Sequence, residues 1–396
     1  MRVCVVYDCL FPYTVGGGER WYRSLAGRLA AEGHEVTYLT LRQWPRGEAP
    51  DGGEGVRVRA VGPRMALYTT GGRRRILPPL VFGVGVLWHL LGRGRRYDVV
   101  DTAAFPYFSL LAAALARPLG RYELVVDWFE VWSDSYWREY LGAAGGRVGA
   151  LVQRACAHVR QRAFCFSELH AARLREEGLR GEPIVLRGLF AESVEPTPPR
   201  AADPLVLFAG RLIPEKQAPL GVAAIALARE RIDALRATFF GDGPERAELQ
   251  RTITRLALDG VVAAPGFADA QTLDRELRRA LCLLLPSRRE GYGLVVIEAA
   301  ARGTPSVVVA GEDNAATELV VDGVNGVIAE RSDAATIADA IVRVANGGQA
   351  LRESTAGWFA ENAERLSLEH SLRIVLDSYS APPTRRHRPG AASARR

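Results

Sequence analysis

The 396-residue sequence predicts an α/β protein made of two doubly wound, Rossmann-like domains that face each other across a cleft. Three observations support this fold class. The chain is longer than the size at which one hydrophobic core stops growing. Short apolar runs typical of buried parallel strands alternate with helical patterns. A polar, proline-rich segment interrupts the alternation once, and the alternation then begins again.

The domain boundaries follow from that interruption. Residues 1–190 form the predicted first domain, and residues 191–204, with four prolines, form the linker. Residues 205–360 form the second domain, and a helix is expected over 361–380. Residues 381–396 read as a basic, disordered tail with five arginines and no acidic residue.

The elements of the first domain begin with a buried strand over residues 2–8. A glycine-rich loop, a helix over 19–31 and a second strand over 34–40 complete a β-α-β unit. Further strands are predicted at 56–61, 97–101, 122–128, 164–167 and 183–187, with helical patterns between several of them. This succession favours a parallel sheet covered by helices.

The glycine-rich loop does not match the dinucleotide fingerprint G-x-G-x-x-G. Gly16 and Gly18 fit, but Trp21 occupies the third glycine position, and no acidic residue ends the second strand to hold a ribose. An oxidoreductase is therefore the least favoured enzyme class. A Walker phosphate loop is excluded because the single lysine, Lys216, does not follow a glycine.

The second domain repeats the pattern. Strands are expected at LVLFAG, ATFFGDG, VVAAPGF, CLLLP and PSVVVA, with helices between them and helical patterns at 333–347 and 350–379. Three loops, beginning at Gly210, at Gly241 and at Arg289, follow strands of this sheet. Because carboxyl ends of parallel strands meet at one edge, these loops are expected to converge on one ligand.

Composition limits the function classes. The formal charge of +6 falls to +1 without the five tail arginines, so the body offers no indication of nucleic-acid binding. The five cysteines form no C-x-x-C pair, and the six histidines show no metal-ligand spacing, so we expect buried thiols and no protein-held metal. The N-terminus enters a strand directly, which predicts a cytoplasmic protein.

One apolar segment, residues 76–91, lies between arginine clusters. It is shorter than the roughly 20 residues that a transmembrane helix needs, and it contains Pro78 and Pro79. A buried or groove-lining helix is the favoured interpretation. Peripheral membrane contact through this segment is the alternative.

The most informative stretch is REGYGLVVIE, which places Glu290 and Glu298 on either side of a glycine turn. Gly291 and Gly293 permit backbone angles closed to other residues, and a helix is expected from Leu294. The start of such a helix offers unsatisfied N–H donors and a positive dipole to an anion. Alone, the pattern also fits a turn with a solvated glutamate.

Two cations belong to the same predicted edge. Arg211 lies in the loop at Gly210, and Lys216, the single lysine among 51 basic residues, ends it. Two cations and a helix start argue for a diphosphate, and nearby carboxylates argue for the hydroxyls of ribose and sugar. A nucleotide-diphospho-sugar has all of these groups.

These motifs resemble those of the GT-B glycosyltransferases, most closely the retaining glycosyltransferase family 4 type. The resemblance covers nearly the whole body and rests on G-R-L-x-P-E-K at 210–216, G-D-G-P at 241–244 and E-G-Y-G-L-x-x-x-E at 290–298. It implies a GT-B fold, an acceptor-binding first domain, a nucleotide-sugar-binding second domain and a last helix that crosses back to the first domain.

The resemblance also implies roles for individual residues. Arg211 and Lys216 would hold the donor diphosphate, Glu290 the donor sugar and Glu298 the ribose. The donor site would further include Gly17, Gly18, Gly210, Gly291, Tyr292, Gly293 and Leu294. Transfer from the nucleotide sugar to an acceptor hydroxyl would retain the anomeric configuration, give an α-glycoside and need no metal or other cofactor.

The acceptor side departs from the family pattern. Many similar enzymes carry a histidine in the loop after the strand that ends near Asp127, where this chain has Phe129. Asp127, Glu130 and Asp134 are the candidate contacts to acceptor hydroxyls. The aromatic residues around them fit either a sugar or lipid platform or a core.

Two alternatives stay open beside a glycosyltransferase that takes a small-molecule, glycan or lipid-linked acceptor. A nucleotide-sugar epimerase or hydrolase on the same fold would need further acid–base groups, and the first half offers few histidines for this. A non-catalytic nucleotide-sugar-binding protein would bind the donor without turnover. The donor base, the sugar, the acceptor and the oligomeric state do not follow from the sequence.

Overall fold

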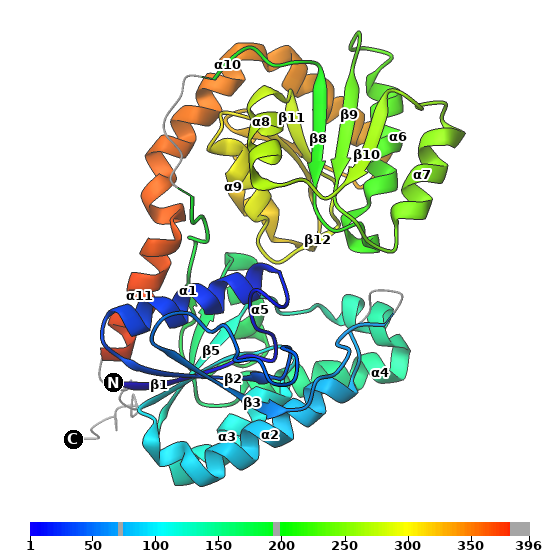
Figure 1. Ribbon diagram of the computed structural model, residues 1–396. Helices are drawn as coiled ribbons and strands as arrows, with labels where there is room; N and C mark the ends of the chain where they lie inside the picture. The colour runs from blue at the N-terminus through cyan, green and yellow to red at the C-terminus, as the bar shows by residue number, and fades with distance from the viewer. Residues whose placement is uncertain (70–73, 193–198, 381–396) are drawn as a thin grey trace, which may run out of the picture.

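The computed structural model describes residues 1–69, 74–192 and 199–380. It contains two large parallel sheets, one in each domain, and the two domains lie one above the other in Figure 1. Parts of residues 191–204, expected as a linker, and all of residues 381–396, expected as a tail, lie outside the described residues. The predicted pair of doubly wound α/β domains is confirmed.

The first domain has seven parallel strands in the order β3-β2-β1-β4-β5-β6-β7. The strands are β1 (Arg2–Val6), β2 (Glu35–Leu41), β3 (Val56–Gly62), β4 (Val99–Ala103), β5 (Glu123–Trp128), β6 (Arg162–Cys165) and β7 (Ile184–Val185). The strand order reverses direction between β1 and β4. In open α/β sheets ligands bind beside the carboxyl ends of the strands at such a switch point.

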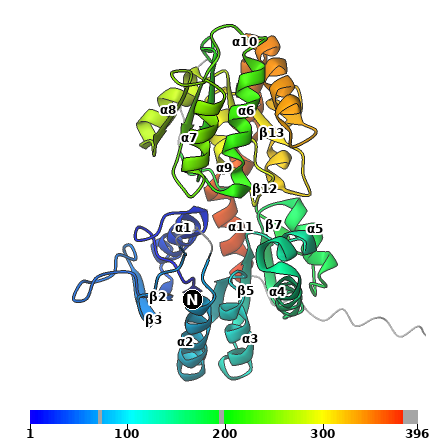
Figure 2. The same ribbon diagram turned by 90° about the vertical axis from the view of Figure 1, so that its right-hand side faces the viewer.

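Helices cover both faces of this sheet. They are α1 (Gly17–Ala31), α2 (Leu77–Arg93), α3 (Phe108–Gly120), α4 (Asp134–Ala157) and α5 (Glu168–Glu176), with a short 3₁₀ turn η1 (Gly94–Arg96) after α2. Helices α2 and α3 lie side by side on the face turned away from the second domain, whereas α1 lies toward that domain (Figures 1 and 2). Trp21, Leu25 and Leu29 of α1 repeat at helical spacing and are buried.

The second domain has six parallel strands in the order β10-β9-β8-β11-β13-β15. They are β8 (Leu205–Ala209), β9 (Arg236–Phe240), β10 (Val262–Gly266), β11 (Cys282–Leu285), β13 (Ser306–Val309) and β15 (Gly326–Ala329). A separate two-stranded sheet pairs β12 (Arg289–Glu290) with β14 (Asp313–Asn314). Every residue of β11 is buried, as its continuous apolar run predicts.

The remaining helices follow the strands of the second domain, except that the last one packs on the first domain. They are α6 (Ala218–Ala228), α7 (Arg246–Arg255), α8 (Ala270–Arg279), α9 (Leu294–Ala300), α10 (Ala334–Leu366) and α11 (Leu368–Ser380), with 3₁₀ turns η2 (Pro214–Lys216) and η3 (Ala315–Leu319). Gly348, at φ +51°, interrupts α10 between the two predicted helical stretches. The helix expected over 361–380 is therefore the end of α10 followed by α11.

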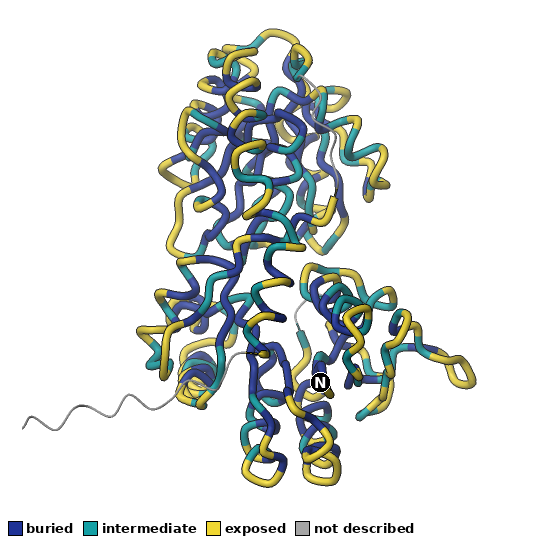
Figure 3. Tube along the Cα trace, turned by 90° about the vertical axis from the view of Figure 1, so that its left-hand side faces the viewer, coloured by how far each residue is buried: buried dark blue, intermediate teal, exposed yellow. Residues whose placement is uncertain are grey.

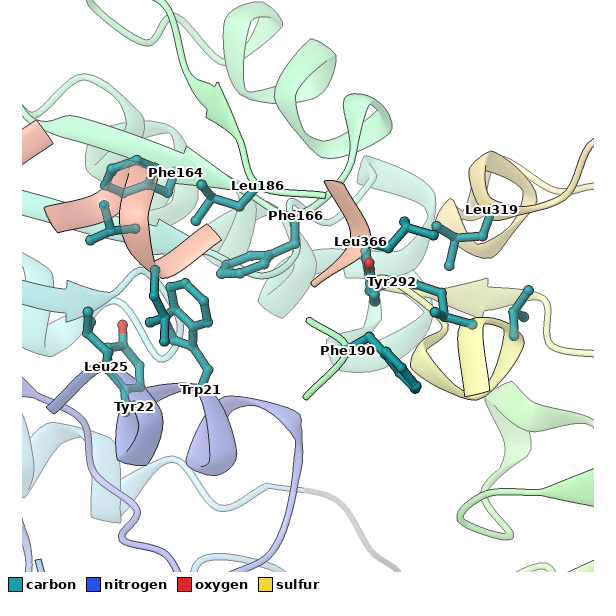
Figure 4. Packing of buried hydrophobic residues seen from close by; sticks show 14 of the residues in the cluster. Trp21, Tyr22, Leu25, Phe164, Phe166, Leu186, Phe190, Tyr292, Leu319 and Leu366 are labelled. Atoms are coloured by element: carbon teal, nitrogen blue, oxygen red, sulfur yellow. The ribbon is translucent and has the colours of Figure 1, made fainter. Parts of the chain in front are cut away.

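The C-terminal helices join the domains. Leu368 donates its amide to the carbonyl of Phe190 at 2.8 Å, and Phe190 donates to the carbonyl of Leu366 at 3.0 Å. From there α11 packs on the first domain, where the Tyr379 hydroxyl donates to Asp101. Phe166, Leu186, Phe190, Tyr292, Leu319 and Leu366 belong to a buried apolar cluster with members from both domains (Figure 4). This shared packing limits how the domains can move apart.

Burial follows the expected pattern. Buried segments occupy the centre of each domain, and exposed segments lie outside them (Figure 3). All five cysteines are buried free thiols. Across residues 1–69, 74–192 and 199–380, no helix is long and apolar enough to cross a membrane.

Candidate functional site

Two glycine loops of the second domain pack tightly together at the ends of β8 and β9. Gly210 donates its amide to the carbonyl of Phe240 at 3.0 Å, and Leu212 donates to the carbonyl of Asp242 at 2.9 Å. A Cβ on Gly241, at φ +133°, would stand 1.8 Å from the carbonyl oxygen of Gly210. Glycine is therefore required here for the loops to sit together.

Lys216 and Glu290 meet in this site. The Lys216 ammonium forms an ion pair with the Glu290 carboxylate, and the Ser287 hydroxyl donates to the same carboxylate oxygen at 2.8 Å. Glu290 is buried and Lys216 is partly buried. The structure thus brings together two residues that are 74 positions apart in the chain. The ion pair therefore places one ammonium and one carboxylate side by side in the site.

The turn after Glu290 is shaped by its glycines. Gly293, at φ +98°, immediately precedes α9, and a Cβ there would lie 2.7 Å from the Cβ of Ala316. The Tyr292 hydroxyl donates to the carbonyl of Arg187 in the first domain. Leu294 opens α9, so its amide is among those without an intrahelical acceptor. The turn is held in place from both domains.

Glu298 lies one turn into α9 and is partly buried. Burial raises the pKa of its carboxyl, and the nearby charge of Glu192 raises it further, whereas Arg302 and Arg20 lower it. Arg20 belongs to the first turn of α1 in the other domain. Glu298 therefore lies within electrostatic reach of the glycine loop of the first domain.

That loop begins α1 with Gly16, Gly17 and Gly18. A Cβ on Gly17 would meet nothing within 4 Å, so the backbone is open at this point. A Cβ on Gly18 would stand 2.7 Å from the Tyr7 hydroxyl and 3.6 Å from the ring of Phe129. Phe129, which replaces the expected histidine, therefore lies beside the glycine loop.

Glu130 comes from the first domain and covers the turn formed by Gly291, Tyr292 and Gly293, called the donor turn below because the motif resemblance predicts donor binding there. A Cβ on Gly291 would lie 2.8 Å from Cγ of Glu130. The Trp132 indole donates to the Glu130 carboxylate at 2.9 Å, and Arg289 forms an ion pair with the same oxygen. Of the three candidate acceptor residues, Glu130 is the one that the structure places against the Gly291–Gly293 turn.

Arg289 is a site residue that the sequence analysis missed. Its guanidinium lies 4.2 Å from the ring centre of Tyr136 and 4.9 Å from that of Trp132, and burial lowers its pKa to about 10. The guanidinium lies against both of these first-domain rings, which touch each other edge to face, so it links the Gly291–Gly293 turn to the first domain. The signal was the pair Arg288-Arg289 directly before Glu290, which resembles an ordinary solvated charge run.

The structure places Asp127 away from any acceptor surface. Its side chain is completely buried, and the Trp21 indole donates to its Oδ2 at 2.7 Å. Burial raises the pKa of Asp127 to about 7, and the hydrogen bonds from Trp21 and Tyr22 lower it. Asp127 therefore contacts α1 inside the first domain. The expectation that it touches acceptor hydroxyls is wrong, because its side chain is completely buried.

Asp134 and Arg211 occupy exposed positions. Asp134 opens α4 and faces solvent, without a side-chain hydrogen bond among the described residues. Arg211 is exposed, and its charge lowers the pKa of Tyr68 in the first domain, which burial raises. Arg211 consequently lies within electrostatic reach of both domains.

The aromatic residues near Glu130 are core residues in this structure. Trp128, Trp132, Tyr136 and Trp137 are all buried. His170, beside this group, accepts the amide of Val131 at 3.2 Å, and burial lowers its pKa to about 3. It is neutral at physiological pH and is not placed to act as an acid–base group at the donor turn.

Polar contacts join the domains beside the site. Arg173 of α5 pairs with Asp313 of β14 at 2.5 Å, and Ser133 donates to the same carboxylate at 3.0 Å. The Tyr136 hydroxyl donates to Glu215 at 2.8 Å. A small cavity of about 170 Å³ lies between the domains here, lined by residues that include Tyr136, Arg289 and Asp313.

Among the described residues, no group of three or more histidine, cysteine or acidic side chains is arranged to hold a metal ion. The geometry instead gathers cations and backbone donors at the carboxyl ends of both sheets. Lys216, Arg211 and the start of α9 belong to the second domain, and the open amides at Gly17 belong to the first. This arrangement suits an anionic ligand held between the sheets.

Two family profiles match consecutive parts of the chain. The profile described as "Glycosyl transferase 4-like domain" matches residues 16–188, and the profile described as "Glycosyl transferases group 1" matches residues 191–363. Together they cover the glycine loop, the Lys216–Glu290 pair and Glu298. The chain belongs to the glycosyltransferase family 4 type. The resemblance drawn from the motifs is therefore confirmed.

Curated relatives match the chain over a limited length. A D-inositol 3-phosphate glycosyltransferase from Nocardioides sp. is 33% identical over 190 residues, which are 44% of this chain and 41% of the relative. An alpha-D-kanosaminyltransferase from Streptomyces kanamyceticus is 30% identical over 175 residues, 44% of each chain. The matched stretch thus spans less than half the length of these relatives.

Solved structures match over almost the entire chain. Sucrose-phosphate synthase from Thermosynechococcus elongatus aligns with a TM-score of 0.77 at 19% identity, covering 96% of this chain and 98% of the other. HepE from Anabaena, solved in complex with UDP and glucose, aligns with a TM-score of 0.72 at 18% identity, covering 96% and 100%. At such identities the likeness concerns the fold, and the GT-B expectation is confirmed.

Proposed function

We propose that this protein transfers a sugar from a nucleotide-diphospho-sugar to an acceptor hydroxyl. The observation that carries the proposal is the convergence of Lys216, Glu290 and the Gly291–Gly293 turn beside Glu130 of the other domain. Family membership and the glycosyltransferase relatives support it. The UDP complexes of HepE support a uridine diphosphate sugar as the first donor to test.

The donor diphosphate fits the positive groups of this site. As the bond from sugar to phosphate breaks, negative charge grows on the leaving diphosphate. Lys216 and Arg211 stabilise that charge, and the N–H groups at the start of α9 add partial positive charge. These groups suffice to neutralise the diphosphate without a metal, so we propose a metal-independent reaction.

The carboxylates fit the hydroxyl groups of the donor. Glu298 accepts hydrogen bonds from the ribose, and Glu290 contacts the sugar while its ion pair with Lys216 keeps the ammonium in place. Glu130, covering Gly291, lies where the acceptor hydroxyl would approach. We propose that the acceptor attacks the same face that the diphosphate leaves, which retains the α configuration.

The surroundings favour transfer to an acceptor over epimerisation or hydrolysis. His170 is buried and its Nδ1 accepts the Val131 amide, and burial lowers its pKa, so it offers no accessible acid–base group. Both domains contribute residues around the donor turn, which shields a reactive sugar from water. Non-catalytic donor binding would not need this enclosure.

The test combines binding and turnover. Thermal unfolding is measured with UDP-sugars, GDP-sugars and sugar-free nucleotides, and a donor at 100 times its dissociation constant should stabilise by about 2.7 kcal/mol. Stabilising donors are then incubated with acceptor pools, and the product anomer is read by NMR. Chelation should leave the rate unchanged. No stabilisation by any nucleotide sugar, or a β-linked product, would contradict the proposal.

A further inference from the structure

One face of α2 is apolar and exposed to solvent. Leu77, Leu80, Val84, Trp88 and Leu91 repeat every three or four residues, so they form a single stripe along the helix. Trp88 is 71% exposed, and the other four are between 39% and 61% exposed. The opposite face, with Phe82, Val86 and Leu90, packs into the core of the first domain. The stripe therefore has no cover within the described chain.

The neighbouring helix extends this surface. Helices α2 and α3 lie side by side on the face turned away from the second domain (Figures 1 and 2). Gly94 approaches the Cα of Gly120 closely, so the C-terminal ends of the two helices lie together. Leu115 and Leu119 of α3 are also exposed. Single exposed apolar side chains are common on a monomeric protein, whereas an apolar stripe with further exposed leucines on the adjacent helix is not.

The surroundings of the stripe are strongly basic. Between residues 55 and 97 the sequence contains no aspartate or glutamate and nine arginines: Arg57, Arg59, Arg64, Arg73, Arg74, Arg75, Arg93, Arg95 and Arg96. Arg75 precedes α2, and Arg93, Arg95 and Arg96 follow its apolar stripe. Arg57 and Arg74 pair with Glu35 and Asp8, whereas these four have no ion pair with a carboxylate among the described residues. Both ends of the apolar stripe thus carry positive charge.

We propose that the α2 stripe, with Leu115 and Leu119 of α3, docks this protein on an anionic lipid bilayer. An apolar helix face flanked by arginines inserts at the boundary between head groups and acyl chains, while the arginines contact lipid phosphates. The helix lies in the interface and does not span it. Its inner face remains packed on the sheet.

The charge distribution favours a membrane over a second copy of the chain. In a twofold dimer through α2, the arginines at the ends of one helix would face those of the other in either orientation. That arrangement repels, whereas anionic lipids neutralise both ends. A bilayer also accommodates Trp88, because an indole is well suited to the membrane interface.

Docking would bring the carboxyl-end edge of the first sheet, where α2 begins, toward the lipid surface. Arg74, three residues before Leu77, pairs with Asp8, two residues beyond β1, and its backbone amide donates to the Tyr140 hydroxyl at 3.1 Å. The stripe therefore starts near the carboxyl ends of the first sheet. Membrane docking is measured as vesicle binding, which requires no turnover. A failure of docking can therefore be told apart from a failure of the proposed transfer activity.

Trp88 gives a direct test on the full-length chain. It is the one exposed tryptophan, since the other six are at most 9% exposed. Vesicles of phosphatidylcholine and phosphatidylglycerol with brominated acyl chains should quench its fluorescence, and Trp88→Phe should abolish most of that quenching. Pure phosphatidylcholine vesicles should bind more weakly. Full quenching in Trp88→Phe, or none in the native chain, would overturn the proposal.

Co-sedimentation with vesicles tests the same surface in variants whose charge is changed. The double variant L80E/W88E should bind the mixed vesicles about tenfold less. Replacing Arg93, Arg95 and Arg96 by glutamine should weaken binding roughly a hundredfold in total, with a reduced salt dependence. Phe267→Glu, at an exposed apolar position of the second domain, is the matched control and should bind normally. Thermal unfolding of each variant checks that it is folded.

Two outcomes would give vesicle binding, or the exposed stripe, a different explanation. Undiminished vesicle binding by L80E/W88E would locate the contact outside α2, with the basic residues 381–396 as the first region to examine. A concentration-dependent dimer that L80E/W88E abolishes, without vesicle binding by the native chain, would assign the stripe to a second copy. Either result would overturn membrane docking through α2.

Discussion

At the residue scale, the site depends on a pair of opposite charges. Lys216 and Glu290 form an ion pair at the position where the donor is proposed to bind, and Ser287 fixes the carboxylate. Removing either partner leaves the other charge partly buried without compensation. The two residues should therefore act as a unit, and their individual effects should not add.

We predict that Lys216→Ala and Glu290→Gln each lower kcat about 100-fold, because each removes stabilisation of the charge that develops during transfer. The double variant should be only slightly slower than the slower single variant. Initial rates with the donor identified by thermal unfolding measure this. Arg251→Gln, which removes an exposed pair with Glu248 on α7, is the control. Additive losses in the double variant would contradict coupling.

A second residue-scale prediction concerns Asp127. Burial raises its pKa to about 7 from the ordinary value of 3.8. Between about pH 4 and 7 the folded protein holds this proton and the unfolded chain releases it, so stability falls as the pH rises. Asp127→Asn removes one carboxyl of the pair that Asp127 forms with buried Asp101, whose pKa burial also raises, so the unfolding free energy should decline less steeply but still decline. Urea unfolding across this range measures the change.

Asp98 supplies a control of opposite sign. Its hydrogen bond with Arg2 lowers the pKa of the carboxyl, so its stabilising contribution is present above the unfolded pKa and is lost as the pH falls. Asp98→Asn should therefore remove a loss of stability that occurs below about pH 4, and it should keep the native slope between about pH 4 and 7. An Asp127→Asn protein with the native slope between about pH 4 and 7 would contradict the assignment.

At the element scale, the donor turn depends on one glycine. Gly293 combines φ +98° with a position where a Cβ would lie 2.7 Å from Ala316. Gly293→Ala should cost about 2–4 kcal/mol, from backbone strain and overpacking together, and should weaken donor binding. Gly323→Ala, at φ +76° with nothing within 4 Å, should cost only about 1 kcal/mol. Equal losses in urea unfolding would argue against a steric role for Ala316.

Much of this element pattern follows from local sequence. The strand predicted up to Leu285 and the helix predicted from Leu294 are β11 and α9, because apolar runs and glycine punctuation are local signals. The burial of Asp127 is not local. It depends on Trp21, 106 residues away, whose indole meets the carboxylate only after the sheet and α1 pack. An acidic residue at a strand end looks like a site residue without that information.

The contact between Arg289 and the acceptor side was unpredictable for the same reason. The two aromatic rings that its guanidinium contacts, those of Trp132 and Tyr136, belong to the other domain. No periodicity within either segment shows that the two segments meet. The order of motifs predicts the proposed donor residues, whereas the contacts between the two domains follow only from their relative placement.

At the scale of the whole molecule, polar contacts beside the site hold the domains together. Arg173 pairs with Asp313 and donates to the carbonyl of Glu312 at 2.6 Å, and Glu318 accepts the amides of Glu168 and Leu169 at 2.8 and 2.7 Å. The Glu318 contacts lie beside Leu366, where α10 gives way to α11, and the Arg173 contacts are made with the β14 segment. The arrangement fits a closed form that opens about the α10–α11 connection to admit substrates.

Arg173→Gln should shift the equilibrium between closed and open forms toward the open ones, because a charge-assisted contact worth roughly 1–3 kcal/mol is lost. Small-angle scattering without ligand should then show a larger radius of gyration than for the native chain, and a saturating donor nucleotide should reduce the difference. The apparent affinity for the donor should fall in proportion to the closed fraction. Arg154→Gln breaks an ion pair with Glu177 that lies entirely within the first domain, so it should leave the radius unchanged. Equal radii for Arg173→Gln and the native chain would show that packing around Phe190 and Leu366, and not the Arg173 contacts, sets the closed form.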